Sequence, residues 1–507
     1  MINRTDNTPV IVGVSQQTWR EPDTTRTPID ALHEVATAAL TDSNSDKLLA
    51  SIDALAMVRF IADTNPDMAA LFPRNPGELL AQRLGIDNAR IFQATIGGNT
   101  PQQLVNHFAH KLATGEHQAV LISGVELLAT LFSALGSGGD VSAWPGEKTS
   151  LPTTIGEEKD GLTAAEKLHG LYEPINTYPL FETSLRHHLG VSAEEHSTLI
   201  AALCGNMSTI AANNPYAWFQ QARSAADIGT VTDNNRYIGY PYTKAMNARL
   251  AVDMGAALIM TTAGKARELG IDDRQLVYLR GGVDVNDIWY LSERPALHES
   301  PAICLAASTI LPHAGVCVDE INHFDIYSCF PSAVQVACNE IGISPLDPRG
   351  VTVTGGLPYF GGPGNNYSLH AIAEMVAKLR GEESNHGLVT ANGLYLTKHS
   401  LGLYSTEPSE QPWQTIDNSK LQQEIDDAPR RQLAADPTGN ATIESFAVAF
   451  DRNGPVKGII IAENDKRERI VANTLKSEDV LYQLIEQDPI GSGGKVRRDG
   501  EHNIFEF

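Results

Sequence analysis

A predicted strand that runs into a helix through a turn of small residues is the feature that most constrains the fold of this chain. Residues 89–94 have the apolar character of a short buried strand, and residues 101–112 have the periodicity of a helix. The turn between them begins Thr95-Ile-Gly-Gly-Asn. A strand that turns sharply into a helix presents one side chain and several backbone N–H groups at the helix start, where negative charge is stabilised. This turn is therefore the first candidate functional site.

Strands and helices alternate over much of the chain. Residues 9–15, 51–60 and 118–125 are predicted strands, and helical stretches separate them. This order predicts a mostly parallel sheet with helices on its faces. The pattern breaks over residues 127–240 into Gly-, Pro- and Tyr-rich loops interrupted by helices, and it returns at residues 251–260. A long insertion of this kind often covers a ligand site.

A second α/β unit begins near Gln275. Its segment 324–340 repeats the strand, turn and helix found around residue 95, which indicates an internal duplication. The composition changes beyond residue 405, and the last hundred residues alternate short apolar runs with polar turns, as expected for a small antiparallel β-barrel. We therefore predict two α/β halves and an additional domain, at residues 1–270, 271–405 and 406–507.

Composition excludes several classes of function. The chain has 507 residues, too many for a single core. Its formal net charge of −23 argues against broad binding to nucleic acid or to anionic membranes, but it is compatible with a local basic pocket for a phosphorylated ligand. Five cysteines without a C-x-x-C pair argue against a disulfide framework and a structural zinc site. No apolar run is long enough to span a membrane, so we expect a cytoplasmic protein. Separately, we expect no bound metal.

Five sequence blocks in the same order resemble motifs of the thiolase superfamily, in particular its SCP2-type members. Together they cover roughly residues 8–405. They are the turn at Thr95 and Gly98, which matches C-x-x-G-x-x-A; Ser123-Gly-Val-Glu126; Asp253-Met-Gly-Ala-Ala-Leu258, which matches D-G-A-A-A-L; Tyr327-Ser-Cys-Phe-Pro331; and Gly355-Gly-Leu-Pro-Tyr-Phe-Gly-Gly-Pro363, which matches G-G-L-I-S-K-G-H-P.

The resemblance implies a thiolase fold, in which two similar α/β halves with mostly parallel or mixed sheets form αβαβα layers. The additional C-terminal domain is then a small OB-like barrel. The implied ligand is coenzyme A or an acyl-CoA thioester, bound as substrate under the 127–240 insertion, with no separate cofactor. The resemblance leaves open both a homodimer and a monomer.

The residues that perform thiolase chemistry are replaced in this sequence. Thr95 stands at the position of the nucleophilic cysteine, and Gly362 stands at the position of the G-H-P histidine. The second family cysteine aligns with Asn392, or with Lys398 in a shifted register. A threonine hydroxyl is a poor nucleophile without a nearby base. Cysteine-dependent thiolysis or Claisen condensation by the standard route is therefore not expected.

Other residues could support different chemistry at the same place. Tyr327 resembles an aromatic hydroxyl of the thiolase-like steroid side-chain aldolases, so it is a candidate base or donor for retro-aldol cleavage of 3-hydroxyacyl-CoA; alternatively, it packs under the insertion. Asn392 and His399 are further catalytic candidates. The loop that contains Gly361 and Gly362 lets the backbone approach a ligand closely, so the substrate-binding candidates are Gly98, Gly361, Gly362 and Asn365.

Several lesser candidates have simpler interpretations. His107 and His110 are three residues apart on one predicted helix, and a solvated helix face explains them better than a metal site. Cys329 is predicted to belong to the core. Basic clusters at Arg186-His187-His188 and Lys398-His399 are candidates for binding a CoA phosphate or lining the pocket.

The sequence therefore supports an acyl-CoA protein of lipid, fatty-acid or sterol metabolism, similar to an acetyl-CoA acetyltransferase. Two alternatives stay open. The chain could bind acyl-CoA without turning it over, or it could cleave 3-hydroxyacyl-CoA without a cysteine. A third hypothesis is that the C-terminal domain recruits a protein or lipid-metabolism partner and that the core serves as a scaffold.

Overall fold

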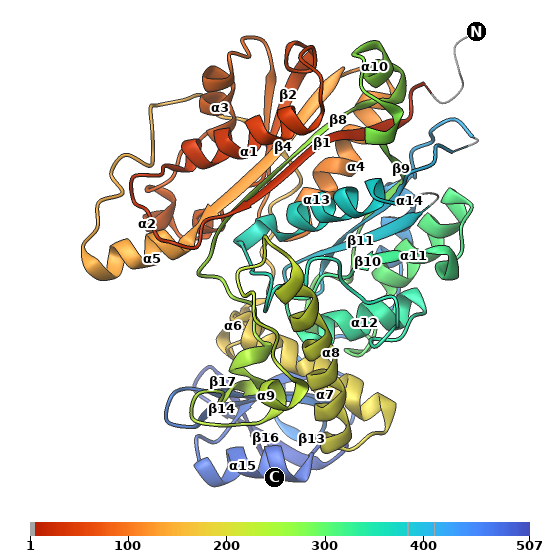
Figure 1. Cartoon of the computed structure of the whole chain (residues 1–507). Coiled ribbons are helices and arrows are strands. Elements are labelled where there is room, and N and C mark those ends of the chain that lie inside the picture. The colour runs from red at the N-terminus through yellow and green to blue at the C-terminus, as the bar shows by residue number, and fades with distance from the viewer. Residues whose placement is uncertain (1–5, 383–384, 410) are drawn as a thin grey trace.

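A computed structural model describes residues 6–382, 385–409 and 411–507. Its centre is a ten-stranded mixed sheet (Figure 1). In sheet order the strands are β10 (His323–Asp325), β11 (His386–Gly393), β12 (Lys398–Ser405), β9 (Val277–Asn286), β1 (Pro9–Thr18), β8 (Asp253–Thr262), β4 (Ala119–Leu127), β2 (Ile52–Met57), β3 (Arg90–Ala94) and β5 (Thr153–Ile155).

The two predicted halves share this sheet. Strands β2, β3, β4 and β8 belong to the first half, and β9 to β12 belong to the second. They join where β1 pairs antiparallel with β8 along its whole length and with β9 at Val10 and Ile11. Parallel pairs are formed by β2 with β3 and β4, by β3 with β5, and by β10 with β11. The predicted mixed α/β fold is therefore confirmed.

Two buried helices lie between the halves, and further helices cover the outer faces. Helices α4 (Thr100–Ala113) and α13 (Tyr367–Arg380) pack on each other and on strands of both halves. This arrangement gives the predicted αβαβα layers. The outer helices on the first half are α1 (Pro28–Asp42), α2 (Pro66–Ala69), α3 (Pro76–Leu84) and α10 (Ala263–Glu268), and those on the second half are α11 (Pro301–Ala314), α12 (Pro331–Ile341) and α14 (Asn418–Asp426).

Local sequence signals explain where these helices begin. Thr27 caps α1 by accepting a hydrogen bond from the Asp30 amide, and Asp30 accepts one from Thr27 in return. Both α4 and α12 have a proline in the first turn, where a missing N–H costs nothing. Side chains of α4 are buried on most of its surface, as the central layer requires.

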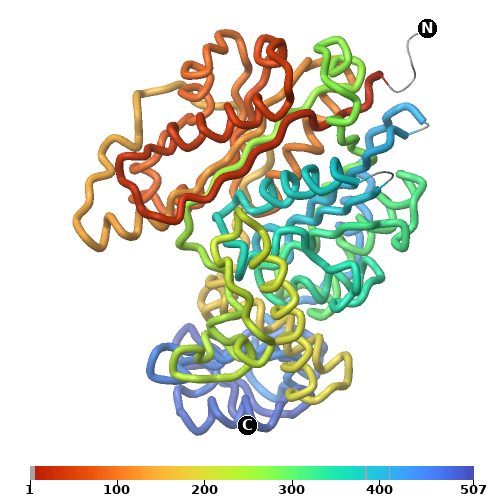
Figure 2. The backbone as a smooth tube through the Cα atoms, in the orientation of Figure 1, coloured from red at the N-terminus to blue at the C-terminus, as the bar shows by residue number. Residues whose placement is uncertain are grey.

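The part of the insertion from residue 164 onward lies between the α/β core and the C-terminal domain (Figure 2). Ser192 and Glu195 form a capping box at the start of its longest helix. Its elements are α5 (Leu128–Ser137), the edge strand β5, α6 (Ala164–Leu168), α7 (Pro174–Leu189), α8 (Ala193–Asn213), α9 (Ala225–Gly229) and β6 (Tyr237–Tyr240), and β7 (Tyr242–Thr243) follows directly.

The C-terminal domain is a closed five-stranded barrel, as the OB-like prediction required. Its strands close in the order β13, β14, β15, β17 and β16, and all neighbours are antiparallel except β15 and β17, which are parallel. The insertion adds to this sheet, because β6 pairs with β13. The elements are β13 (Gly439–Phe450), β14 (Pro455–Asn464), β15 (Arg469–Thr474), α15 (Glu478–Gln487), β16 (Gly493–Asp499) and β17 (His502–Glu506).

Candidate functional site

Thr95 lies at the turn between β3 and α4, as predicted from the sequence. Its side chain is 1% exposed, and its backbone N–H donates to the Ile155 carbonyl at 3.0 Å. Gly156 has a φ of +99°, and a Cβ built there would lie 2.6 Å from the Thr95 hydroxyl oxygen. A glycine at 156 therefore allows the insertion to close against the threonine side chain.

Lys398 is the side chain that the fold brings to Thr95. Its Nζ lies 3.5 Å from Thr95 Oγ1 and donates to the Ile96 carbonyl at 2.9 Å. The residue is 6% exposed, and burial lowers the pKa of its amine to about 8, while the charge of Glu158 acts in the opposite direction. From the sequence, Lys398 was the shifted-register alternative to Asn392 for the second family cysteine and part of a basic pair with His399. A lysine at the start of a strand whose residues are all buried is the feature that marks it in the structure.

Asn365 connects the glycine-rich loop to the turn at Thr95 through hydrogen bonds. Its Oδ1 accepts from the Gly97 N–H at 3.0 Å, and its Nδ2 donates to the Arg59 carbonyl at 2.8 Å. Gly361 and Gly362 precede Asn365 in this loop. A Cβ at Gly361 would meet Met254 Sδ at 2.7 Å, and the Gly362 N–H donates to the Arg249 carbonyl. The structure thus gives a packing reason for Gly361 and places Asn365 directly at the turn.

Tyr327 reaches the turn from the second half. A Cβ built at Gly98 would lie 2.1 Å from the Tyr327 hydroxyl and 2.6 Å from the Asn392 carbonyl oxygen, so only glycine fits at position 98. Burial raises the pKa of Tyr327, which keeps its hydroxyl protonated. Tyr327 is therefore suited to donate a hydrogen bond, and it is a poor base.

Asn392 and His399 lie opposite each other on β11 and β12 and face a cavity of about 10 Å³ that Tyr327 also lines. Asn392 Nδ2 donates to the Tyr178 hydroxyl at 2.9 Å, and burial lowers the pKa of His399 to about 4. Because neighbouring residues of a strand point to opposite faces, Lys398 faces Thr95 and His399 does not.

The remaining candidates are dispersed. Cys329 is half-buried and packs against the core, and burial raises the pKa of its thiol to about 12, which does not suit a nucleophile. Arg186 pairs with Asp488 of the C-terminal domain, and the ring of His188 stacks on His298. In the described part of the chain, no group of three or more His, Cys, Asp or Glu could hold a metal ion. His107, which was expected on a solvated helix face, is half-buried.

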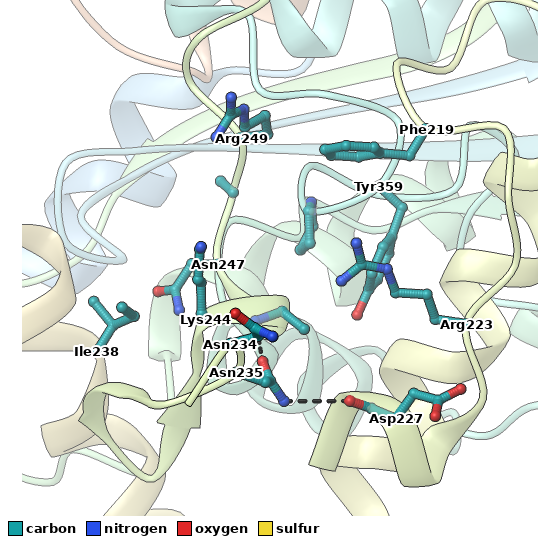
Figure 3. Close-up of a pocket in the computed structure, with 13 residues that line it drawn as sticks. Phe219, Arg223, Asp227, Asn234, Asn235, Ile238, Lys244, Asn247, Arg249 and Tyr359 are labelled. Carbon is teal, nitrogen blue, oxygen red and sulfur yellow. Dashed lines mark hydrogen bonds between the residues drawn. The ribbon is translucent and has the colours of Figure 1, made fainter. Parts of the chain in front are cut away.

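A pocket of about 600 Å³ opens between the insertion and the loop that leads to Gly361 (Figure 3). Arg223, Lys244 and Arg249 bring three positive charges to it, against one carboxylate from Asp227. Such an excess of cations is unusual on a chain of net charge −23, and it favours an anionic ligand. The sequence analysis did not identify these three residues, because Arg223 lies in the insertion and Lys244 and Arg249 lie in the segment after it, with no motif to connect them.

The described residues contain no helix that is both long and apolar enough to cross a membrane. The fold places Thr95 and the buried Lys398 side by side at the turn that precedes α4.

Comparisons with known proteins identify the family more closely. A family model described as the thiolase-like protein type 1 additional C-terminal domain matches residues 420–501. The crystal structure of a monomeric SCP2-thiolase-like protein type 1 from Mycobacterium smegmatis is 35% identical, with a TM-score of 0.84 and 99% of each chain covered. This chain belongs to the SCP2-thiolase-like proteins of type 1.

More distant structures share the fold. The Ltp2–ChsH2(DUF35) aldolase is 17% identical with a TM-score of 0.60, and the dimeric peroxisomal thiolase of Saccharomyces cerevisiae is 14% identical with a TM-score of 0.57. In both cases 80% of this chain and 99% of the other chain are covered. A search of curated protein sequences finds no match.

Proposed function

We propose that this protein binds coenzyme A thioesters, with the phosphates in the cationic pocket and the thioester directed toward the turn at Thr95. One observation carries the proposal: the loop that borders the pocket at Pro358 and Tyr359 continues to Asn365, which holds the Gly97 amide. An elongated ligand with an anionic end and a reactive acyl end fits this layout. A role in lipid or sterol metabolism, similar to that of an acetyl-CoA acetyltransferase, follows from this ligand class.

Calorimetric titration with coenzyme A tests the pocket. Arg223→Ala and Lys244→Ala are each expected to raise the Kd about 3- to 10-fold, because each removes one exposed charge that faces a phosphate. Binding should also weaken as salt is raised. Pantetheine, which lacks the phosphates, should bind more weakly and should not distinguish the variants.

Lys148→Ala is the matched control, because Lys148 is exposed and does not line this pocket. Equal coenzyme A affinity in all four proteins, or no binding by the unmodified chain, would contradict the proposal.

Retro-aldol cleavage of 3-hydroxyacyl-CoA is a second candidate, and the position of the Tyr327 hydroxyl against Gly98 favours it. A protonated phenol there could donate to the thioester oxygen as the enolate forms. Tyr327→Phe is then expected to lower turnover of 3-hydroxyacyl-CoA by on the order of 10²-fold or more and to leave its affinity unchanged. Mass spectrometry of the products measures this, and retention of thioesters without any product would indicate a binding protein.

A further inference from the structure

Thr95 and Lys398 form a buried pair whose two polar atoms face each other. Lys398 Nζ lies 3.5 Å from Thr95 Oγ1, and the two residues are 6% and 1% exposed. Gly97 makes room for the amine, because a Cβ at that position would lie 3.1 Å from Nζ. A turn of the first half and strand β12 of the second half create this contact, although its members are 303 residues apart in the sequence.

A lysine amine beside a hydroxyl is a known solution for activating a weak nucleophile. The amine must be neutral to accept the hydroxyl proton, and burial makes the charged form costly. Serine–lysine pairs use the same principle in hydrolases that have no histidine. With a pKa of about 8, roughly a tenth of the Lys398 amines are neutral at pH 7.

The charges around Lys398 are few. Glu158 is the carboxylate whose charge acts on the amine, and Arg59 neutralises it in an ion pair. The Ile96 carbonyl is the other polar contact. Arg59 also forms an ion pair with Asp63. Little unpaired carboxylate charge therefore remains near Lys398 to stabilise its protonated amine when a thioester binds.

We propose that Thr95 and Lys398 are a nucleophile and its general base, and that they take the acyl group of a coenzyme A thioester as a threonine ester. Thr95 Oγ forms a bond to the carbonyl carbon while Lys398 Nζ accepts the hydroxyl proton. The carbon–sulfur bond breaks, and the proton passes to the leaving sulfur to give free coenzyme A. No oxidant, reductant or metal takes part. The inference rests on the proposed ligand class and extends it to a covalent step.

A short exposed segment follows the glycine that covers Thr95. Gly156 covers the hydroxyl, and residues 157–160 that follow it are exposed. The negative charge that develops on the carbonyl oxygen falls near the amino end of α4, where the helix dipole stabilises it.

The experiment incubates the full chain with acetyl-CoA, then quenches it and maps the acyl group by peptide mass spectrometry. The unmodified protein and Thr95→Ser are expected to carry one acetyl ester in the peptide of residue 95. Thr95→Val should carry none. Lys398→Met and Lys398→Arg should acylate on the order of 10²- to 10⁴-fold more slowly, because neither provides the base. The rate should rise with pH up to about 8 and then level off, and Lys398→Met should lose this profile.

Lys148→Met is the matched control and should acylate like the unmodified chain. Calorimetry with coenzyme A on each protein measures binding separately from acylation. Binding without acylation, an acetyl amide on Lys398, or an ester that persists in Thr95→Val would overturn the covalent step alone. Loss of binding in the unmodified chain would overturn the proposed ligand and the covalent step together.

Discussion

Replacing Asp325 by alanine is expected to lower the free energy of unfolding by about 4 kcal/mol, because its carboxylate is a buried acceptor for several groups at once. Asp325 is 0% exposed at the end of β10. One oxygen accepts from the Thr352 hydroxyl at 2.8 Å and from the amides of residues 353 and 354 at 3.0 and 3.1 Å. The other accepts from the Tyr367 hydroxyl at 3.1 Å. Alanine removes this acceptor from all four donors: the Thr352 and Tyr367 hydroxyls keep Thr354 Oγ1 as a second partner, whereas the two amides lose theirs.

The same carboxylate connects the fold to the site. Residues 352–354 lead into the glycine-rich loop, and Tyr367 begins α13 immediately after it. Asp325 thus fixes both ends of the segment that carries Asn365. We therefore expect Asp325→Ala to weaken coenzyme A binding as well as to destabilise the chain.

Urea unfolding followed by circular dichroism measures the first effect. Asp325→Asn keeps the shape and one acceptor oxygen, so it should lose about half as much stability. Asp87→Ala is the control, because Asp87 is exposed, and a change of less than about 0.5 kcal/mol is expected there. A loss below 1 kcal/mol in Asp325→Ala would show that water or neighbouring groups replace the carboxylate.

The fold could be predicted from the sequence because its signals are local. The turn at Thr95 was predicted between a strand at 89–94 and a helix at 101–112, and the structure has β3 ending at Ala94 and α4 beginning at Thr100. The alternation of apolar strands with amphipathic helices is sufficient for such elements. The barrel was predicted equally well, but its one parallel pair, β15 with β17, joins segments that are not neighbours in sequence, and hairpin signals do not report such pairs.

The candidate site was harder to predict because its contacts are long-range. The sequence aligned the second family cysteine with Asn392, or with Lys398 in a shifted register, and the strand register decides which of them faces Thr95. A shift of one residue moves every side chain of a strand to the other face. The sequence therefore grouped His399 with the catalytic candidates, whereas β12 directs it toward α11 and α12.

Glycines posed a similar difficulty. Gly98 and Gly361 were both predicted to serve a ligand, because small residues allow close approach of the backbone. In the structure each has a close neighbour in the protein, Tyr327 for Gly98 and Met254 for Gly361. Sequence alone does not distinguish a glycine that meets a ligand from one that meets a side chain of the same chain.

Two buried histidines are expected to make the folded chain much less stable in mild acid. His370 is 0% exposed on α13, and His399 is 3% exposed on β12. Burial lowers the pKa of His370 to about 3 and that of His399 to about 4. The described residues offer no hydrogen-bond partner to Nε2 of either ring. Both rings are therefore neutral in the folded chain at pH 7.

The sign of the effect follows from proton uptake. In the unfolded chain both histidines bind protons below about pH 6.5, whereas the folded chain does not bind them until pH 4 or lower. Between these limits the unfolded state takes up more protons, so the free energy of unfolding falls as the pH falls. Each histidine is expected to contribute a loss of about 3 kcal/mol by pH 4.

Urea unfolding at half-unit steps from pH 7 to pH 4 measures this loss, and glutamine variants assign it. His370→Gln and His399→Gln should each make the curve of stability against pH shallower by about one proton, because glutamine does not titrate. His187→Gln, at an exposed position of α7, should leave the slope unchanged. Equal slopes in all four proteins would mean that both rings gain protons in the folded chain as readily as in the unfolded one, and that buried carboxylates alone govern its acid sensitivity.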